Sequence, residues 1–242
     1  MKDTVPVRRV EADVRRLLRP VARELSRGGL GLAAAQELAA DVPLKVLEDL
    51  YALVARDPAA RSSPVYAYAS YLSFRALLAH RVAHELHRFA AAPGQGGSVL
   101  VAARRIAERA KRESGVEIHP AAVIGARAVI DHGYGTVIGE QVRIGSDCYL
   151  LQNVVLGSRS IRSGPAQWSG RRHPWIGDRV EIAGNVSVFG PVTIGDDCRI
   201  ESGARVVTDV PPGSRVRVVS VLQVTSAGVR GVEHAADGAH RR

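Results

Sequence analysis

The sequence changes its period near residue 117, and this change restricts the possible folds more than any other feature. From Ile118 onward an Ile, Leu or Val recurs at every sixth residue, with a two-residue shift after residue 130 and a longer break after residue 156. The thirteen positions are 118, 124, 130, 138, 144, 150, 156, 176, 182, 188, 194, 200 and 206. Neither an α-helix nor an alternating strand places such residues on one face. A triangular parallel β-helix does, because each hexad forms one short face and one corner.

The residue four places after each aliphatic position supports this interpretation. It is small or valine in twelve of the thirteen hexads, and Tyr134 is the exception. A side chain of that size fits beside the aliphatic residue in the narrow interior of a prism. Cys148 and Cys198 occupy this position, so we expect them to be interior residues without a catalytic or metal-binding role. Three hexads make one coil, and about four coils would stack at roughly 4.8 Å per coil.

Residues 1–116 have a helical pattern instead. Val10, Val14 and Leu18 recur at a spacing of four, and Gly28-Gly29 ends that run. Further helical segments are predicted over 38–53, 64–92 and 98–112. The sequence therefore predicts an α+β protein with an all-helical oligomerisation domain over 1–116, a parallel β-helix over 117–212 with an inserted loop over 158–174, and a tail over 213–242.

Composition and charge exclude several classes of protein. Hydrophobic residues make up 46% and charged residues 24%, which is typical of a folded chain. No apolar run approaches the roughly 18 residues of a membrane span, and the N-terminus lacks the apolar core of a secretory signal. The net charge of +9 is spread as single residues and doublets without interleaved aromatic residues, which argues against nucleic-acid binding. We therefore expect a soluble cytoplasmic protein that binds neither membrane nor nucleic acid.

The hexad pattern is interrupted twice, and solenoid proteins usually carry function at such interruptions. The first interruption, residues 131–136, begins with the pair Asp131-His132. The second, residues 158–174, is too long for a corner turn and must leave the prism as a loop. It ends with Arg172-His173-Pro174. The two interruptions therefore hold the candidate chemical groups of the prism.

Three histidines of the helical region share one face. His80, His84 and His87 are spaced as i, i+4 and i+7, which could hold a metal ion. No carboxylate or cysteine completes a ligand set, so the sequence favours helix packing or a subunit interface, and no metal is predicted.

Five motifs occur in a fixed order along the predicted β-helix. They are EIHPAA from residue 117, DHxxG from 131, GE at 139–140, LLQNVVLG from 150 and RHP from 172. In order and register they resemble the bacterial serine O-acetyltransferase family of hexapeptide-repeat acyltransferases. The RDPA turn at 56–59 and the segment 71–86 resemble the helical domain of that family more loosely. The resemblance implies a left-handed β-helix, an exception to the usual right-handed crossover.

The resemblance also implies direct acetyl transfer from acetyl-CoA, as co-substrate, to the hydroxyl of L-serine, without a metal or a covalent enzyme intermediate. His132 falls on the position of the general base, and Glu117 stands where the family has an aspartate that holds the imidazole. The implied acceptor-binding residues are Asp57, Asp131, Arg172 and His173. The implied coenzyme-side residues are Gly157, Ser158, Gly184 and Ser202. The family forms homotrimers or dimers of trimers, with each site between neighbouring subunits.

These residue types suit the reaction. A histidine, with an ordinary pKa of about 6.5, can take the proton of a serine hydroxyl as the oxygen attacks the thioester. A carboxylate on the other ring nitrogen fixes the tautomer and stabilises the imidazolium. An amino-acid acceptor needs a cation for its carboxylate, which Arg172 supplies, and carboxylates for its ammonium group, which Asp57 and Asp131 supply.

The sequence departs from the family pattern in three places. The loop 158–171 is longer, and Ser158 and Arg171 replace a glycine and an aspartate. After Gly213 the segment that helps to wall the coenzyme channel is absent. The chain ends in Ala-His-Arg-Arg rather than the isoleucine that docks into the sulfhydrylase partner, so that complex is not predicted. We hypothesise that Trp168 and the added residues reshape the pocket for another small hydroxyl acceptor; a non-catalytic assembly protein on the same fold is the other alternative.

Overall fold

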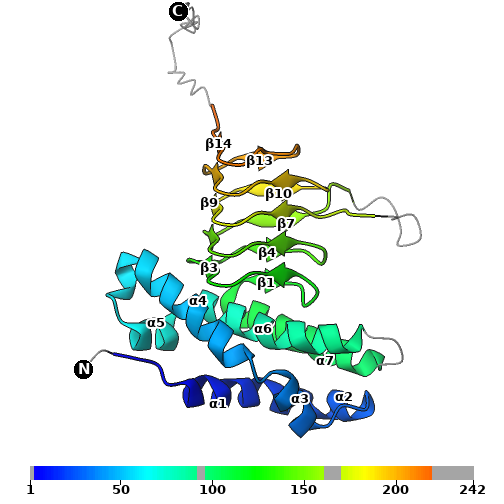
Figure 1. Cartoon of the computed structure of the whole chain (residues 1–242). Helices are drawn as coiled ribbons and strands as arrows, with labels where there is room; N and C mark the ends of the chain where they lie inside the picture. Colours follow the sequence, from blue (N-terminus) through cyan, green and yellow to red (C-terminus); the bar gives the residue numbers. More distant parts are fainter. Residues whose placement is uncertain (1–2, 92–95, 161–169, 220–242) are drawn as a thin grey trace, which may run out of the picture.

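The computed structural model describes residues 3–91, 96–160 and 170–219. These residues form a layer of helices at one end of the molecule and a three-sided prism of short parallel strands that stands on this layer (Figure 1). The predicted fold class is confirmed: an all-helical region precedes a left-handed parallel β-helix. No helix in the described part of the chain is long and apolar enough to span a membrane.

The helical layer differs from the sequence prediction at several element boundaries. Its elements are α1 (Val7–Leu18), η1 (Arg19–Val21), α2 (Ala22–Arg27), α3 (Leu32–Leu38), α4 (Val42–Arg56), η2 (Pro58–Ala60), α5 (Pro64–Ser70), α6 (Leu72–Ala90) and α7 (Gly97–Ser114). The segment predicted as one helix over 64–92 is divided, because Tyr71 has an extended backbone (φ −83°, ψ 109°) between α5 and α6. Helix α7 begins at Gly97, with Gly96 as its N-cap, one residue before the segment predicted over 98–112.

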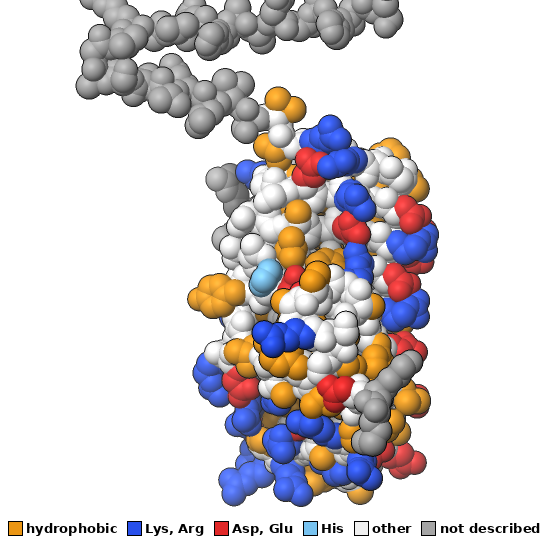
Figure 2. Space-filling view, turned by 90° about the vertical axis from the view of Figure 1, so that its left-hand side faces the viewer, with side chains coloured by type: hydrophobic (Ala, Val, Ile, Leu, Met, Phe, Trp, Pro, Cys, Tyr) orange, Lys and Arg blue, Asp and Glu red, His pale blue; other side chains and the backbone are white. Residues whose placement is uncertain are grey.

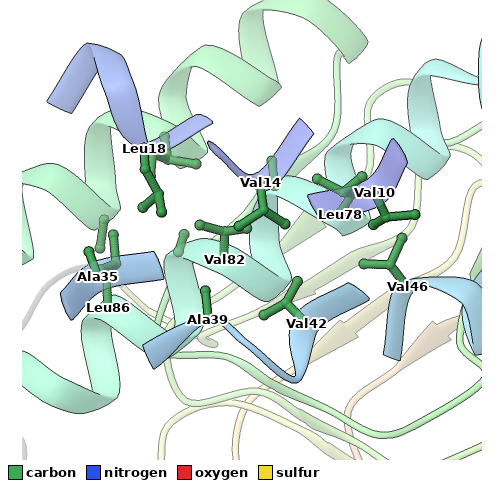
Figure 3. Packing of buried hydrophobic residues seen from close by; sticks show 14 of the residues in the cluster. Val10, Val14, Leu18, Ala35, Ala39, Val42, Val46, Leu78, Val82 and Leu86 are labelled. Atoms are coloured by element: carbon green, nitrogen blue, oxygen red, sulfur yellow. The ribbon is translucent and has the colours of Figure 1, made fainter. Parts of the chain in front are cut away.

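Helix α1 buries its apolar stripe in the centre of the helical layer. Val10, Val14 and Leu18 lie on one face of α1 and are almost fully buried. Figure 3 shows them packed against side chains of α3, α4 and α6. Helix α6 also faces the prism, because its Leu77 belongs to the core of the β-helix while the adjacent Leu78 belongs to the helical core. This helix therefore joins the two cores.

The prism has three faces, and each face is a parallel sheet. The strands are β1 (Glu117–Ile118), β2 (Val123–Ile124), β3 (Val129–Ile130), β4 (Val137–Ile138), β5 (Arg143–Ile144), β6 (Tyr149–Leu150), β7 (Val155–Gly157), β8 (Trp175–Ile176), β9 (Glu181–Ile182), β10 (Ser187–Phe189), β11 (Thr193–Ile194), β12 (Arg199–Ile200), β13 (Arg205–Val206) and β14 (Arg215–Val216). Face A holds β1-β4-β7-β10-β13, face B holds β2-β5-β8-β11, and face C holds β3-β6-β9-β12-β14. The chain thus passes the A/B, B/C and C/A corners in turn on each coil.

The period of six is explained by the interior of the prism. All thirteen aliphatic positions of the hexads are buried strand residues, and the hydrophobic core of the prism consists mainly of them and of the small residues four places later. Cys148 and Cys198 are buried members of this core, as predicted. Tyr134, the exception to the small-residue rule, is 74% exposed, because the shifted turn that carries it leaves the prism.

A buried ion pair attaches the helical layer to the B/C corner of the first coils. The guanidinium of Arg81 in α6 donates to both carboxylate oxygens of Asp49 in α4, at 2.9 and 3.0 Å, and to the carbonyl oxygens of Ile124 and Gly125. Asp49 also accepts a hydrogen bond from the backbone N–H of Ala128 at 3.0 Å. Burial raises the pKa of Asp49 to about 6, although Arg81 opposes that shift. Figure 2 shows that Lys and Arg side chains gather at the helical end of the face in view.

Candidate active site

The first interruption of the hexads forms an exposed turn at the C/A corner. His132 follows β3 with a left-handed backbone (φ 56°), and Gly133 and Gly135 are also left-handed (φ 74° and 76°). This turn presents the imidazole to solvent, with 70% of the side chain exposed. Its Nε2 lies 3.8 Å from Oδ2 of Asp131, whose Oδ1 accepts the backbone N–H of His132 at 2.8 Å. The aspartate and histidine of the DHxxG motif are therefore adjacent in space.

The helical layer adds a second carboxylate to this corner. Asp57 follows α4, and its Oδ1 accepts the backbone N–H of Ala59 at 2.8 Å, which fixes the turn before η2. Asp57 and Asp131 are both more than nine-tenths buried. Two tyrosines join them: the Tyr71 hydroxyl donates to Asp57 Oδ2 at 2.5 Å, and the Tyr149 hydroxyl donates to Asp131 Oδ2 at 2.8 Å. The structure therefore brings together Asp57, Asp131 and His132.

Both phenols are affected by both carboxylates. Burial, the hydrogen bond to Asp57 and the charges of Asp57 and Asp131 raise the pKa of Tyr71. Burial, the hydrogen bond to Asp131 and the charges of the same two carboxylates raise the pKa of Tyr149. The two phenols consequently stay protonated at neutral pH and act as hydrogen-bond donors.

Arg56 fastens the Asp57 turn to face C of the prism. Its guanidinium lies over the ring of Tyr149, 4.4 Å from the ring centroid, and forms an ion pair with Glu181 at 2.6 Å. It also donates to the backbone carbonyl of Asp147. Tyr149 is the outward residue of β6, which pairs with β3 so that Val129 lies opposite Tyr149. Because Asp131 lies two residues beyond Val129 on the same side, the Tyr149 hydroxyl reaches its carboxylate.

The second interruption supplies a different cluster, at the A/B corner. The guanidinium of Arg172 pairs with the carboxylate of Glu140, and its backbone N–H donates to Oε1 of Gln141 at 3.0 Å. His173 is buried beside Gly139, where an added Cβ would lie 2.5 Å from the imidazole, so the packing requires glycine there. Burial and the charge of Arg172 lower the pKa of His173, which favours a neutral ring. Arg172 and His173 are thus adjacent, one face away from His132.

Glu117 lies on face A, between these two corners. Its carboxylate forms ion pairs with Lys111, at 2.5 Å, and with Arg104, at 3.9 Å, both from α7. Across the described ranges no hydrogen bond joins Glu117 to His132. Instead, the carboxylate of Asp131 lies within ion-pair distance of that imidazole. The role of Glu117 in orienting the imidazole therefore stays a prediction.

The four expected coenzyme-side residues divide between the same two corners. Gly157 and Ser158 lie at the A/B corner, where β7 ends. Gly184 and Ser202 lie at the C/A corner on later coils, and the Ser202 hydroxyl donates to the Gly184 carbonyl at 2.7 Å. Both pairs are farther from the helical layer than His132 along the stack of coils. Trp168 lies outside the described residues.

Two of the three histidines of α6 contact the first coil, and the ring centroid of the third, His80, lies 5.6 Å from that of His84. His84 Nδ1 lies 2.9 Å from the carbonyl oxygen of Pro120, and the His87 ring lies edge-on to the ring of His119. Burial lowers the pKa of His80 and His84. Within residues 3–91, 96–160 and 170–219, no group of three or more His, Cys, Asp or Glu side chains is arranged to hold a metal ion.

Sequence reasoning missed Tyr71, Tyr149 and Gln141 as contacts of the site. Tyr149 precedes an aliphatic hexad position, so the pattern shows only that it points outward. Tyr71 lies in the segment that resembles the family's helical domain, but its distance in sequence from Asp131 conceals their proximity. Gln141 follows the GE motif and contacts the backbone of Arg172, an interaction that only the path of the second interruption defines.

A prism of hexad coils with an aspartate–histidine pair on one corner and an arginine–histidine pair on the next defines the hexapeptide-repeat class of acyltransferases. The serine acetyltransferase of Mycobacterium tuberculosis is 42% identical over 168 residues, which are 69% of this chain and 67% of that protein. The chain belongs to the serine acetyltransferase family.

Solved structures agree with this assignment. The Neisseria gonorrhoeae serine acetyltransferase in complex with serine has a TM-score of 0.67 and 30% identity, and the match covers 87% of this chain and 83% of that one. Isoform 3 of the Entamoeba histolytica enzyme in complex with cysteine has a TM-score of 0.70 and 27% identity, covering 91% and 72%. No model of a known protein family matches the sequence.

Proposed function

We propose that the protein transfers the acetyl group of acetyl-CoA to the hydroxyl oxygen of L-serine. The observation that carries this proposal is the convergence of Asp57, Asp131 and His132 from two parts of the chain on one corner of the prism. Two carboxylates beside an exposed imidazole suit an acceptor that has an ammonium group next to a reactive hydroxyl. The complexes of relatives with serine and with cysteine favour an amino acid of this size.

The reaction is a direct displacement with His132 as general base. The imidazole takes the hydroxyl proton while the serine oxygen bonds to the thioester carbonyl carbon, which forms a tetrahedral oxyanion. Backbone N–H groups near the corner turns stabilise that oxyanion. The carbon–sulfur bond then breaks, and the imidazolium returns its proton to the departing thiolate of CoA. The products are O-acetylserine and CoA.

The acceptor carboxylate is matched by Arg172 and the neutral His173, which lie at the A/B corner of the same chain. Because His132 occupies the C/A corner, we infer that the A/B corner of one subunit faces the C/A corner of the next in a closed homotrimer. The coenzyme then lies along the same seam, near Gly157 and Ser158 of one subunit and Gly184 and Ser202 of its neighbour. A dimer of trimers through the helical layer is compatible with this arrangement.

The acetyl-CoA requirement, the cytoplasmic location and the absence of a sulfhydrylase complex stay predictions. The proposed reaction needs acetyl-CoA as its acyl donor, and the protein would encounter this donor in the cytoplasm. The tail on which the partner prediction rests, residues 220–242, lies outside the described part of the chain.

The test is a panel of hydroxyl acceptors with acetyl-CoA, measured as thiol release, for the wild type and His132→Ala. We expect L-serine to have the highest kcat/KM, and the variant to lose about 100- to 10,000-fold in kcat. A different small hydroxyl acceptor that outcompetes serine would support the alternative specificity. Thiol release that is absent with every acceptor would support a non-catalytic assembly protein.

A further inference from the structure

Two phenol hydroxyls contact the two carboxylates that we assign to the acceptor. Tyr71 donates to Asp57 at 2.5 Å, and Tyr149 donates to Asp131 at 2.8 Å. The tyrosines come from different parts of the fold, since Tyr71 precedes α6 and Tyr149 lies in β6. Both hydrogen bonds are part-buried. The arrangement therefore repeats the same donor–acceptor pair twice at one corner.

The remaining acceptor capacity of the carboxylates can be counted. On Asp57 one oxygen accepts the N–H of Ala59 and the other accepts the Tyr71 hydroxyl. On Asp131 one oxygen accepts the N–H of His132 and the other accepts the Tyr149 hydroxyl. A carboxylate offers about four acceptor positions, so about two remain on each. A primary ammonium group has three N–H donors, which this remaining capacity can satisfy.

The chemical nature of the donors matters as much as their positions. A lysine or arginine in place of either phenol would neutralise the carboxylates and compete with an incoming ammonium group. A phenol supplies a hydrogen bond without adding positive charge. The guanidinium of Arg56 lies over the ring of Tyr149, but it forms its ion pair with Glu181 instead of with these carboxylates. The carboxylates thus have neutral donors while their negative charge stays available.

We propose that Tyr71 and Tyr149 are positioning residues that hold Asp57 and Asp131 as a two-carboxylate cradle for the primary ammonium group of the acceptor. This inference rests on the proposed function and deepens it, because it explains how the site selects an amino acid over a simple alcohol. The backbone donors and the phenols fix both carboxylates before the acceptor arrives, so less ordering is needed on binding.

The test compares Tyr71→Phe and Tyr149→Phe with a matched control, Tyr68→Phe. The Tyr68 hydroxyl donates to Asp13 at 2.7 Å, so this variant loses the same kind of hydrogen bond elsewhere in the helical layer. Steady-state rates are measured with L-serine and with 3-hydroxypropionate, which is serine without its ammonium group. Because hydrogen bonds to charged groups are the stronger ones, we expect the KM for serine to rise about tenfold or more in each site variant.

The other kinetic constants distinguish a loss of carboxylate positioning from general damage to the fold. We expect kcat and the KM for acetyl-CoA to stay within about threefold, and kcat/KM for 3-hydroxypropionate to stay unchanged. The preference for serine over 3-hydroxypropionate therefore falls about tenfold in the site variants and not in Tyr68→Phe. A serine KM within about twofold of the wild type in both site variants, or an equal loss with both acceptors, overturns the proposal.

Calorimetric binding of L-serine distinguishes this proposal from the proposed function. If the wild type releases no thiol with serine, the proposed function fails, but weaker serine binding by the two site variants than by the wild type still supports the cradle. If the wild type does not bind serine at all, the cradle is overturned as well.

Discussion

The C/A and A/B corners of the prism carry two different clusters of candidate site residues. The C/A corner has two buried carboxylates, two phenol donors and an exposed imidazole, which suits an ammonium group and a proton transfer. The A/B corner has an arginine beside a buried neutral histidine, which suits a carboxylate. A whole face separates the two corners in one chain. Under the proposed function, each end of the amino acid is recognised on a different edge of the prism, so this difference predicts that assembly of subunits completes the site.

The B/C corner provides a contrast to both. It carries bidentate pairs between Arg127 and Asp147 and between Arg179 and Asp197, and all four residues have left-handed backbones. In Figure 2 acidic and basic side chains alternate along an edge of the prism. None of the expected site residues lies at this corner, and the Arg81–Asp49 pair attaches the helical layer there. It therefore serves as an internal control for the other two.

The largest predicted effect comes from mixing two impaired variants, assayed at a serine concentration well below the wild-type KM. His132→Ala damages only the C/A corner, and Arg172→Ala damages only the A/B corner. If one subunit supplies each corner, random reassembly of an equal mixture restores an intact site at about one position in four. We expect the mixture, after reversible dissociation, to recover up to about a quarter of wild-type activity, about 25- to 2,500-fold the activity of His132→Ala alone. Activity of the mixture equal to the mean of the two variants would mean that both corners act within one chain.

Adjacent arginines allow the A/B corner to be tested alone. Arg172 pairs with Glu140, whereas Arg171 lies over the Trp175 ring, 4.4 Å from its centroid, and bonds to Thr193. We expect Arg172→Ala to raise the KM for serine about 10- to 100-fold, because a charged hydrogen bond to the acceptor carboxylate is lost. Arg171→Ala is the control and should leave that KM within about threefold. Equal effects of the two substitutions would contradict the assignment of Arg172.

The sequence predicts the prism better than the site for a physical reason. The interior accepts one aliphatic residue per hexad, so the period itself identifies Ile118, Ile138 and Leu156 as core. Corner residues have no such constraint, and their proximity depends on how coils stack and how α6 packs. Tyr71 follows Asp57 by 14 residues, with η2 and α5 between them, whereas Tyr149 meets Asp131 because β6 pairs with β3. The sequence motif identifies Glu117 as a candidate site residue, but the ion pairs of Glu117 with α7 depend on tertiary packing.

The B/C corner should affect stability rather than acceptor binding. Asp49 and Arg81 are both buried, so Asp49→Leu leaves the guanidinium without its counter-charge and should lower the free energy of unfolding by about 3–5 kcal/mol. Because burial already raises the pKa of Asp49 to about 6, the attraction only partly offsets the cost of burying the charges. The double variant Asp49→Leu/Arg81→Met should therefore lose less than Asp49→Leu. Thermal unfolding checks this order, and a double variant less stable than Asp49→Leu would contradict it.

The smallest effect is expected from a cysteine inside the same corner. Cys148 fills the small-residue position of its hexad, which alanine fills at 122, 128 and 204. Its thiol donates to the Gly177 carbonyl at 3.1 Å, and burial raises its pKa to about 11, so the reactive thiolate is scarce at neutral pH. We expect Cys148→Ala to keep kcat and both KM values while losing about 1 kcal/mol of stability, and the folded wild type to react slowly with iodoacetamide. A loss of kcat in a fully folded Cys148→Ala would show that the B/C corner contributes to catalysis, and the division of labour among the three corners would then be wrong.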